Sequence, residues 1–309
     1  MLPEEQINLY GYKNDLDKFS NFYNNGSLPK KILLTGNEGI GKCTFAYHFI
    51  NIILSKNTED QYNLDKNVIN INSKSFKLVK NNSHPNFFKI SLNDEKNSID
   101  ITQIRDMIQF SRKTSFDNNE KIILIDKIEH LNSNSANALL KILEDLNDKI
   151  IFILIHSKGK KIIKTIKSRC IEFTLSLNNE FLSNIINSFF KKEVYESINN
   201  EFKKYYFSPK FYIDLINISN EFKFDFKNNG IESFLELLIN NKIYLKKNYS
   251  HIDFKIFIEL YFYNKTLYSK NINYVNYFSY FNNRYSEFKK YNLDLESFFI
   301  ELNRKILNV

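Results

Sequence analysis

Residues 31–44 read KILLTGNEGIGKCT, an apolar run followed by a glycine-rich turn and the start of a predicted helix. The glycines and the lysine follow a predicted strand, and the helix is expected from Lys42 to about Leu54. This is the context that a phosphate-binding P-loop requires, because glycines let backbone N–H groups converge on phosphate oxygens. The helix N-terminus adds partial positive charge, and Lys42 can reach the outer phosphates. A turn with a surface lysine would explain the glycines, but not the strand, spacing and helix together.

The residue after this lysine departs from the usual motif. Cys43 stands where a Ser or Thr hydroxyl normally binds Mg²⁺, and a thiol is a poor ligand for this oxygen-preferring cation. Thr44 comes one residue late and would point elsewhere on the helix. We therefore expect weak ATP binding through the loop backbone and Lys42, and the use of Mg²⁺ stays open.

A second predicted strand, at residues 121–125, ends in Asp126, as in a Walker B strand whose aspartate serves Mg²⁺. An ATPase of this type usually has a glutamate next, but this chain has Lys127, which cannot accept a proton from water. Loss of a general base costs about 10²–10⁴ in rate, so the isolated chain is expected not to be an enzyme. Glu129 follows two residues later, and the sequence gives no reason for it to substitute. Taken alone, the segment could also be a core strand with a solvent-exposed aspartate.

Outward from these motifs, the first half of the chain alternates apolar runs with helical patterns. Further strands are expected at 87–90, 150–155 and 171–174, and helices at 101–110 and 135–146. Apolar runs that alternate with helices indicate an α/β fold whose parallel sheet is covered on both faces. The polar segment 57–82 is predicted to be a loop insertion.

The pattern changes after about Leu175, where strand-like runs give way to helical ones. Short helices are expected at 181–190, 195–206 and 209–220, and longer aromatic-rich helices at 231–245, at 253–267 and beyond. We predict three domains, an α/β domain at 1–175 and all-α domains at 176–228 and 229–309. The aromatic residues recur at helical spacing, which favours helix packing over stacking on nucleic-acid bases.

Composition limits the classes of function. The 309 residues carry 43 Lys and Arg against 35 Asp and Glu, a formal net charge of +8 that is compatible with a role near nucleic acid. An AT-biased genome would also enrich Lys, so the charge alone decides nothing. Two cysteines, Cys43 and Cys170, are too few for a disulfide framework or a four-cysteine zinc site. No run approaches the ~18 apolar residues of a membrane span and no secretory signal is apparent, so we expect a cytoplasmic protein without membrane contact.

Four stretches in order resemble one family. They are LLTGNEGIGK (33–42), HPNFFKI with IDITQIR (84–90 and 99–105), IILIDKIEHLNSNSANALLKILED (122–145) and TIKSRC (165–170). Together they resemble the AAA+ clamp-loader subunits of bacterial DNA polymerase III, with the delta-prime type as the best fit. The resemblance covers about residues 2–175, and the NALLK block together with SRC is more specific than the P-loop.

This resemblance implies a RecA-like AAA+ P-loop domain, a helical lid and a C-terminal helical collar that holds five subunits in a ring. It also implies a role in DNA replication, in which the ATP-bound loader opens a sliding clamp, places it on primed DNA and releases it on hydrolysis. The implied partners are other clamp-loader subunits in a hetero-pentamer, the clamp and, through the complex, primed DNA. In this family the SRC arginine points at ATP of the neighbouring subunit, so Arg169 is expected to be a catalytic arginine finger in trans. Fingers in general contribute about 10³–10⁵ in rate.

Departures from the family pattern favour a non-motor, delta-prime-like subunit. Cys43 and Lys127 damage the chain's own site, whereas Arg169 is intact. The four-cysteine zinc module of many relatives is missing from residues 51–82, so no zinc is expected. A sensor arginine is expected near Pro209, where Lys210 stands.

The expected site residues follow from these motifs. The predicted cofactor-binding residues are Gly36, Gly39, Gly41, Lys42, Cys43, Thr44 and Asp126, and no separate metal site is predicted. Two alternatives stay open, an active ATPase motor subunit of the same loader and a P-loop kinase that acts on a metabolite. ATP turnover by the isolated chain would indicate the first. The second would need an acceptor-binding base in the α/β domain and no SRC turn.

Overall fold

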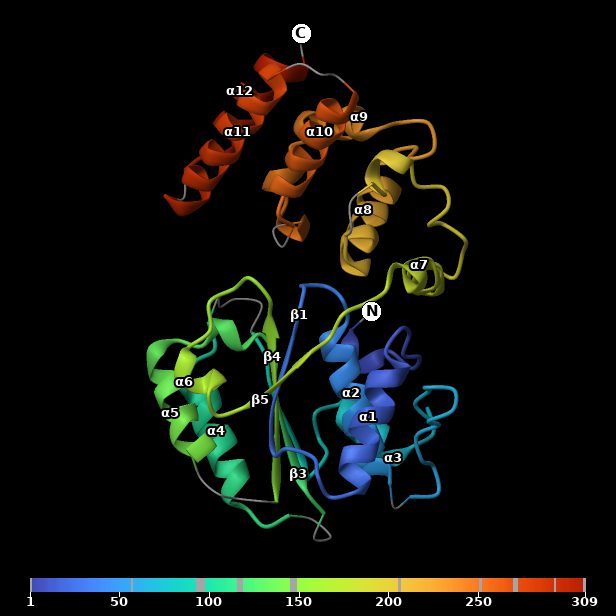
Figure 1. The fold of residues 1–309 in the computed structure, drawn as a ribbon, viewed down its shortest axis with the longest axis vertical. Helices are drawn as coiled ribbons and strands as arrows, with labels where there is room; N and C mark the ends of the chain where they lie inside the picture. The colour runs from blue at the N-terminus through green and yellow to red at the C-terminus, as the bar shows by residue number, and fades with distance from the viewer. Residues whose placement is uncertain are drawn as a thin grey trace. The chain divides into compact units, whose positions relative to one another are not determined.

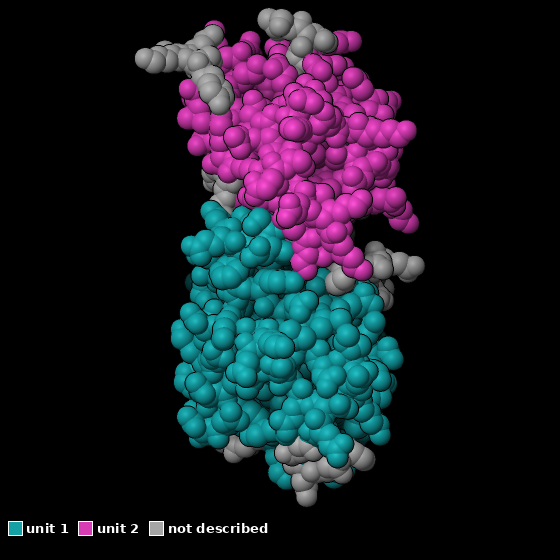
Figure 2. All heavy atoms as spheres, turned by 90° about the vertical axis from the view of Figure 1, so that its right-hand side faces the viewer, with its two compact units in different colours: residues 1–185 teal, residues 186–309 magenta. Residues whose placement is uncertain are grey.

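A computed structural model describes residues 2–56, 58–92, 98–115, 119–144, 149–204, 207–249, 252–268, 272–291 and 293–307. The chain divides into two compact units, residues 1–185 and 186–309 (Figure 2). The boundary expected at 175/176 falls inside the first unit, because the segment that follows it packs there. A Cβ placed on Gly11 would lie 2.5 Å from the side chain of Leu177 and 3.1 Å from that of Phe181. A further division at 228/229 stays a prediction.

A five-stranded parallel sheet in the order β2-β3-β4-β1-β5 forms the centre of the first unit. Its strands are β1 (Lys31–Gly36), β2 (Phe87–Ile90), β3 (Lys121–Ile125), β4 (Ile150–Ser157) and β5 (Ile171–Thr174). In register, Leu33 of β1 lies opposite Leu154 of β4, and Ile123 of β3 lies opposite Phe152. The expected strands and their parallel arrangement are confirmed. The inner strands are buried along their length, which explains their continuous apolar runs.

Two groups of helices cover opposite faces of this sheet (Figure 1). One group is α1 (Lys13–Asn24), α2 (Lys42–Ser55) and α3 (Lys74–Lys80), and the other is α4 (Ile101–Arg112), α5 (Ser133–Glu144) and α6 (Lys164–Lys167). Ile104 of α4 and Leu139 and Leu143 of α5 pack into the same apolar core as Ile123 of the sheet. The RecA-like architecture expected for this part of the chain is thereby confirmed.

The segment expected to be a loop insertion contains a helix. Ser73 caps α3 by accepting a hydrogen bond from the N–H of Phe76, and Phe76 and Val79 are buried. The prediction of an irregular loop is therefore wrong for residues 74–80.

The described residues of the second unit form helices joined by turns and contain no strand. It contains most of α7 (Leu182–Phe190), then α8 (Pro209–Phe222), α9 (Ile231–Asn240), α10 (Lys255–Tyr268), α11 (Ile272–Lys290) and α12 (Leu295–Leu302), with a π turn at Asn303–Leu307. Single 3₁₀ turns occur in both units, at Pro3–Glu5, Ile128–His130, Asn179–Phe181, Asn200–Phe202, Ile243–Leu245 and Lys247–Tyr249. None of the helices in the described ranges is long and apolar enough to span a bilayer.

The core of this unit is aromatic, as the helical spacing predicts. The ring of Phe202 lies 5.0 Å from that of Phe226 and 5.7 Å from that of Phe234, both edge to face. The prediction of a helix at 195–206 is wrong, because the described residues of this segment form turns. Asn187 Oδ1 accepts hydrogen bonds from the N–H groups of Val194 and Tyr195, which holds the chain in a non-helical path.

Candidate functional site

The glycine-rich loop lies between β1 and α2, at the carboxyl ends of the parallel strands. Gly39 and Gly41 have φ angles of 79° and 93°, in the left-handed region that favours glycine. A Cβ on Gly36 would lie 2.6 Å from the carbonyl oxygen of Leu175, so only glycine fits this close approach. The loop thus has the backbone of a phosphate-binding turn that opens a 14-residue helix.

Lys42 points into its own loop. Its Nζ donates hydrogen bonds to the carbonyl oxygens of Gly36 (2.9 Å) and Asn37 (2.7 Å), and only 6% of the residue is exposed. Burial lowers the pKa of this ammonium, while attraction from Glu129 and other carboxylates opposes the shift. A phosphate would replace neutral carbonyl acceptors with charged ones, which form the stronger bonds.

The side chains expected at the metal position are weak ligands. Burial raises the pKa of the Cys43 thiol well above its ordinary value, so the sulfur stays protonated near neutral pH. The negative charge of Asp126 raises that pKa further. Thr44, the next residue of α2, is rotated roughly 100° around the helix. Within the described ranges, no three His, Cys, Asp or Glu side chains gather as a metal-binding group.

Asp126 follows directly after β3, at the carboxyl end of the strand. Its N–H donates to the carbonyl oxygen of Ile90 at 2.9 Å, which fixes the chain beside β2. Burial raises the pKa of its carboxyl, and Lys127 and Lys89 counteract that rise. Lys127, in the place of the usual glutamate, has a left-handed backbone (φ 57°, ψ 54°) and begins the turn Ile128–His130.

Glu129 is the residue of this site that the sequence did not predict. Its side chain is 3% exposed, and its Oε2 accepts a 3.4 Å hydrogen bond from the N–H of Ser157, the last residue of β4. Glu129 is also the carboxylate that most strongly opposes the lowering of the Lys42 pKa. The 3₁₀ turn brings this carboxylate to Ser157, which lies opposite Gly36 in the sheet register. A carboxylate two residues beyond the usual position therefore still reaches the site.

A second lysine approaches the loop from the turn after β4. Lys160 Nζ lies 3.0 Å from Glu38 Oε2 of the P-loop and 3.9 Å from Glu129 Oε1. We call Glu38, Lys42, Asp126, Glu129 and Lys160 the phosphate-site cluster. They come from the ends of β1, β3 and β4, where a parallel sheet gathers its functional side chains.

Arg169 lies away from this cluster. It follows α6 and precedes β5, whose first residue, Ile171, lies opposite Ile32 near the start of β1. The four residues of β5, about 13 Å of chain, separate it from the P-loop end of the sheet. Its Nη1 donates to the carbonyl oxygen of Thr165 (2.9 Å) and its Nη2 to Glu144 Oε1 (2.5 Å). The guanidinium is about one third exposed, at the opposite end of the strands from the chain's own phosphate site.

Lys210 lies on α8 of the second unit, where the family pattern places a sensor arginine. Its Nζ pairs with Asp214 Oδ2 at 2.9 Å, one turn further along the helix.

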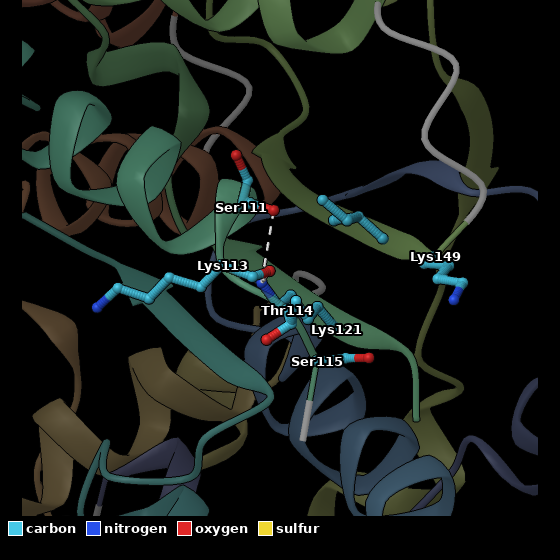
Figure 3. A pocket seen from close by; sticks show the side chains of 7 residues that line it. Ser111, Lys113, Thr114, Ser115, Lys121 and Lys149 are labelled. Atoms are coloured by element: carbon cyan, nitrogen blue, oxygen red, sulfur yellow. Dashed lines mark hydrogen bonds between the residues drawn. The ribbon is translucent and has the colours of Figure 1, made fainter. Parts of the chain in front are cut away.

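A cavity of about 190 Å³ opens at the amino ends of β3 and β4 (Figure 3). Its lining residues are Ser111, Lys113, Thr114, Ser115, Lys121, Lys149 and Ile150. Lys121 is 3% exposed, and its ammonium donates to the carbonyl oxygens of Phe110, Ser111 and Lys113. These bonds use all three of its N–H groups to cap the end of α4, so the buried lysine is structural.

The family model described as "DNA polymerase III, delta subunit" matches residues 11–179, which include the P-loop, Asp126 and Arg169.

Among curated relatives, DNA polymerase III subunit delta' of Pseudomonas aeruginosa is 30% identical over 140 residues, 45% of this chain and 41% of the relative. DNA polymerase III subunit gamma of Buchnera aphidicola subsp. Schizaphis graminum is 29% identical over 195 residues, 62% of this chain and 50% of the relative. The matches therefore span half or less of these relatives. A solved DNA polymerase III gamma subunit-related protein of Thermotoga maritima aligns over 96% of this chain and 97% of its own, with 16% identity and a TM-score of 0.46.

Proposed function

Because the chain belongs to the DNA polymerase III delta subunit family, we propose that it is a delta-prime-like, non-motor subunit of a clamp loader. In this role it joins other clamp-loader subunits in a cytoplasmic hetero-pentamer that loads a sliding clamp onto primed DNA. The observation that carries the proposal is the contrast between two sites on one unit. The P-loop has a thiol at the metal position, whereas the arginine of the SRC turn is intact and accessible.

Arg169 acts in trans in this proposal. Its present partners are a carbonyl oxygen and the half-exposed carboxylate of Glu144, and an exposed ion pair contributes only about 0–1 kcal/mol. The guanidinium can therefore exchange them for phosphate oxygens of a neighbouring subunit at small cost. Its planar fork then neutralises charge on the phosphoryl group being transferred.

The chain's own site binds nucleotide weakly and does not hydrolyse it. Gly36, Gly39, Gly41 and Lys42 hold phosphate through the loop backbone and one ammonium. Asp126 is the remaining oxygen ligand for Mg²⁺, and Cys43 adds only a neutral thiol. Lys127 cannot take a proton from water, so the step that needs a general base fails.

A second candidate function is an active ATPase subunit of the same machine. The match to a gamma subunit over 62% of this chain favours it. So does Glu129, a buried carboxylate whose charge acts on Lys42 and that could serve as a base from an unusual position.

Two measurements test the proposal. The purified chain is mixed with motor subunits, and complex formation is followed by size-exclusion chromatography. ATP turnover is then measured for the chain alone and for the complex, with and without clamp and primed DNA. We expect assembly, negligible turnover by the chain alone and stimulated turnover by the complex. Steady turnover by the chain alone that Glu129→Gln abolishes would establish the second candidate, and failure to assemble would refute both.

A further inference from the structure

Lys160 belongs to the phosphate-site cluster without being part of any motif. We propose that it binds the terminal phosphate of a nucleoside diphosphate or triphosphate, or of pyrophosphate, and that Glu38 holds it in place until the phosphate arrives. On this account, Lys160 supplies positive charge where Cys43 weakens the metal site. The inference rests on the proposed nucleotide binding, and it adds Lys160 to Lys42 as a second positively charged side chain that contacts the phosphates.

Hydrogen bonds hold the backbone of the turn that carries Lys160, which follows β4. The N–H of Lys158 donates to the carbonyl oxygen of Gly36 at 2.9 Å, which ties this turn to the P-loop itself. The N–H of Lys160 donates a hydrogen bond to the carbonyl oxygen of Ser157 at 3.1 Å. The carbonyl oxygen of Lys160 in turn accepts a hydrogen bond from Nε2 of His156, also at 3.1 Å. The ammonium thus extends from a fixed turn toward the mouth of the loop.

The two carboxylates near this ammonium differ in solvent exposure. Glu129 is almost fully buried, and its Oε1, 3.9 Å from Lys160 Nζ, accepts no hydrogen bond from any described residue. Glu38 is 53% exposed on the loop and contacts the same Nζ at 3.0 Å. Glu38 can therefore leave while Glu129 keeps the ammonium at the site. A phosphate oxygen can then take the place of the Glu38 carboxylate, because an ammonium donates hydrogen bonds to either anion.

The arrangement also explains why binding would be weak. A phosphate must displace the Glu38 carboxylate from Lys160 and the loop carbonyls from Lys42. Removing the negative charge of Glu38 should favour the phosphate, and removing the positive charge of Lys160 should disfavour it.

Calorimetry of the full chain with ADP and with pyrophosphate, in Mg²⁺ and in EDTA, tests the inference. Lys160→Met should weaken binding about ten-fold in both buffers, the loss of one charge-assisted hydrogen bond. Glu38→Gln should strengthen it by about three-fold. Lys158→Met removes a lysine two positions away on the same turn and should bind as the wild type does. Binding by the wild type should change little when EDTA replaces Mg²⁺.

The opposite outcomes overturn the inference. These are a Lys160→Met variant that binds like the wild type, an equal loss in Lys158→Met, or wild-type binding that disappears in EDTA. A wild type that binds neither ligand at millimolar concentration also overturns it. Each of these results leaves the proposed clamp-loader role intact, because assembly with motor subunits is measured separately and does not depend on Lys160.

Discussion

A single atom, the sulfur of Cys43, decides how the P-loop can use a metal. Burial keeps the thiol protonated, and Mg²⁺ prefers oxygen ligands. The glycines and Lys42 nearby have the geometry of an intact loop, so the loop's defect in metal binding lies in one side chain. A single substitution should therefore restore what is missing.

We expect Cys43→Ser to make nucleotide binding depend on Mg²⁺. The hydroxyl adds an oxygen ligand beside Asp126, so affinity for ADP should rise about five- to ten-fold in Mg²⁺, the contribution of one good polar contact. In EDTA the affinity should match that of the wild type. Isothermal calorimetry measures both values, and Cys43→Ala is the control that removes sulfur without adding oxygen. An equal gain in both variants would mean that the thiol acts through its size.

Glu129 is the residue of the site that could not be placed there from the sequence. Gly36, Lys42 and Asp126 could be placed in the site because each follows directly from a strand or begins a helix. Glu129 depends on a one-turn 3₁₀ helix, and its partner Ser157 comes from a strand 28 residues away. Only the sheet order brings those two strand ends together.

At the scale of elements, packing determined what local patterns could not. The strands were predictable because the sheet is buried on both faces and leaves continuous apolar runs. Helix α3 was missed since only Phe76 and Val79 of its seven residues are large buried apolar side chains. The false helix at 195–206 had aromatic residues at helical spacing, but Asn187 binds the backbone there in a turn. Side-chain-to-backbone hydrogen bonds of this kind leave no periodic signal.

His48 joins α2 to the N-terminal segment and predicts a pH dependence of stability. Its Nε2–H donates to the Gln6 carbonyl oxygen (3.1 Å), and its Nδ1 accepts from the Tyr62 hydroxyl (2.8 Å). Burial lowers its pKa from 6.5 to about 4, so the folded state binds this proton less readily than the unfolded state does. The stabilising effect is complete above pH 6.5 and is lost as the pH falls toward 4. The loss should approach about 3 kcal/mol.

Chemical denaturation at several pH values measures this effect. Wild type and His48→Gln are compared between pH 7 and pH 4, and the variant should lose less stability over that range. The comparison is needed because burial lowers the pKa of His84 as well, and that residue is common to both proteins. Parallel curves for the two proteins would show that His48 does not carry the dependence.

The aromatic core of the second unit gives another prediction at this scale. Phe234 is fully buried against Phe202, Phe226 and Phe257. Phe234→Ala should cost about 3–5 kcal/mol of folding free energy, because it leaves a cavity among these rings. Tyr277, which is 40% exposed on α11, is the matched control, and Tyr277→Ala should change stability by less than about 1 kcal/mol. Thermal denaturation monitored by circular dichroism compares the two, and equal effects would argue against a packed aromatic core.

At the scale of the whole molecule, the P-loop and Arg169 lie at opposite ends of the parallel strands. The phosphate-site cluster lies at the carboxyl ends of the strands, whereas Arg169 precedes the amino end of β5. A guanidinium in that position cannot serve its own P-loop without leaving its turn. The geometry therefore favours a subunit whose effect on catalysis is exerted on a neighbour, and the two ends can be damaged independently.

We expect Lys42→Ala and Arg169→Ala to differ in their effect on the ATPase rate of the assembled complex. Lys42→Ala disables a site that we propose does not hydrolyse ATP, so ATPase activity of the complex should stay near the wild-type rate. Arg169→Ala removes charge stabilisation from the neighbouring site, where a finger contributes about 10³–10⁵ in rate. Total turnover should fall only in part if, as the family resemblance implies, the other subunit interfaces have their own arginine fingers. Arg169→Lys should rescue incompletely, since an ammonium lacks the planar fork that meets two phosphate oxygens.

The measurement is ATPase activity of the reconstituted complex with clamp and primed DNA, after each variant is shown to assemble. Lys167→Ala is the control, because this lysine lies two residues before Arg169 and pairs with Glu172 on the surface (2.8 Å). It should leave turnover unchanged, which separates loss of the finger from disturbance of the turn. If Arg169→Ala assembles and turns over at the wild-type rate, Arg169 is a surface residue held by Glu144. If Lys42→Ala alone lowers the rate, the chain's own P-loop hydrolyses ATP and the chain acts as a motor subunit.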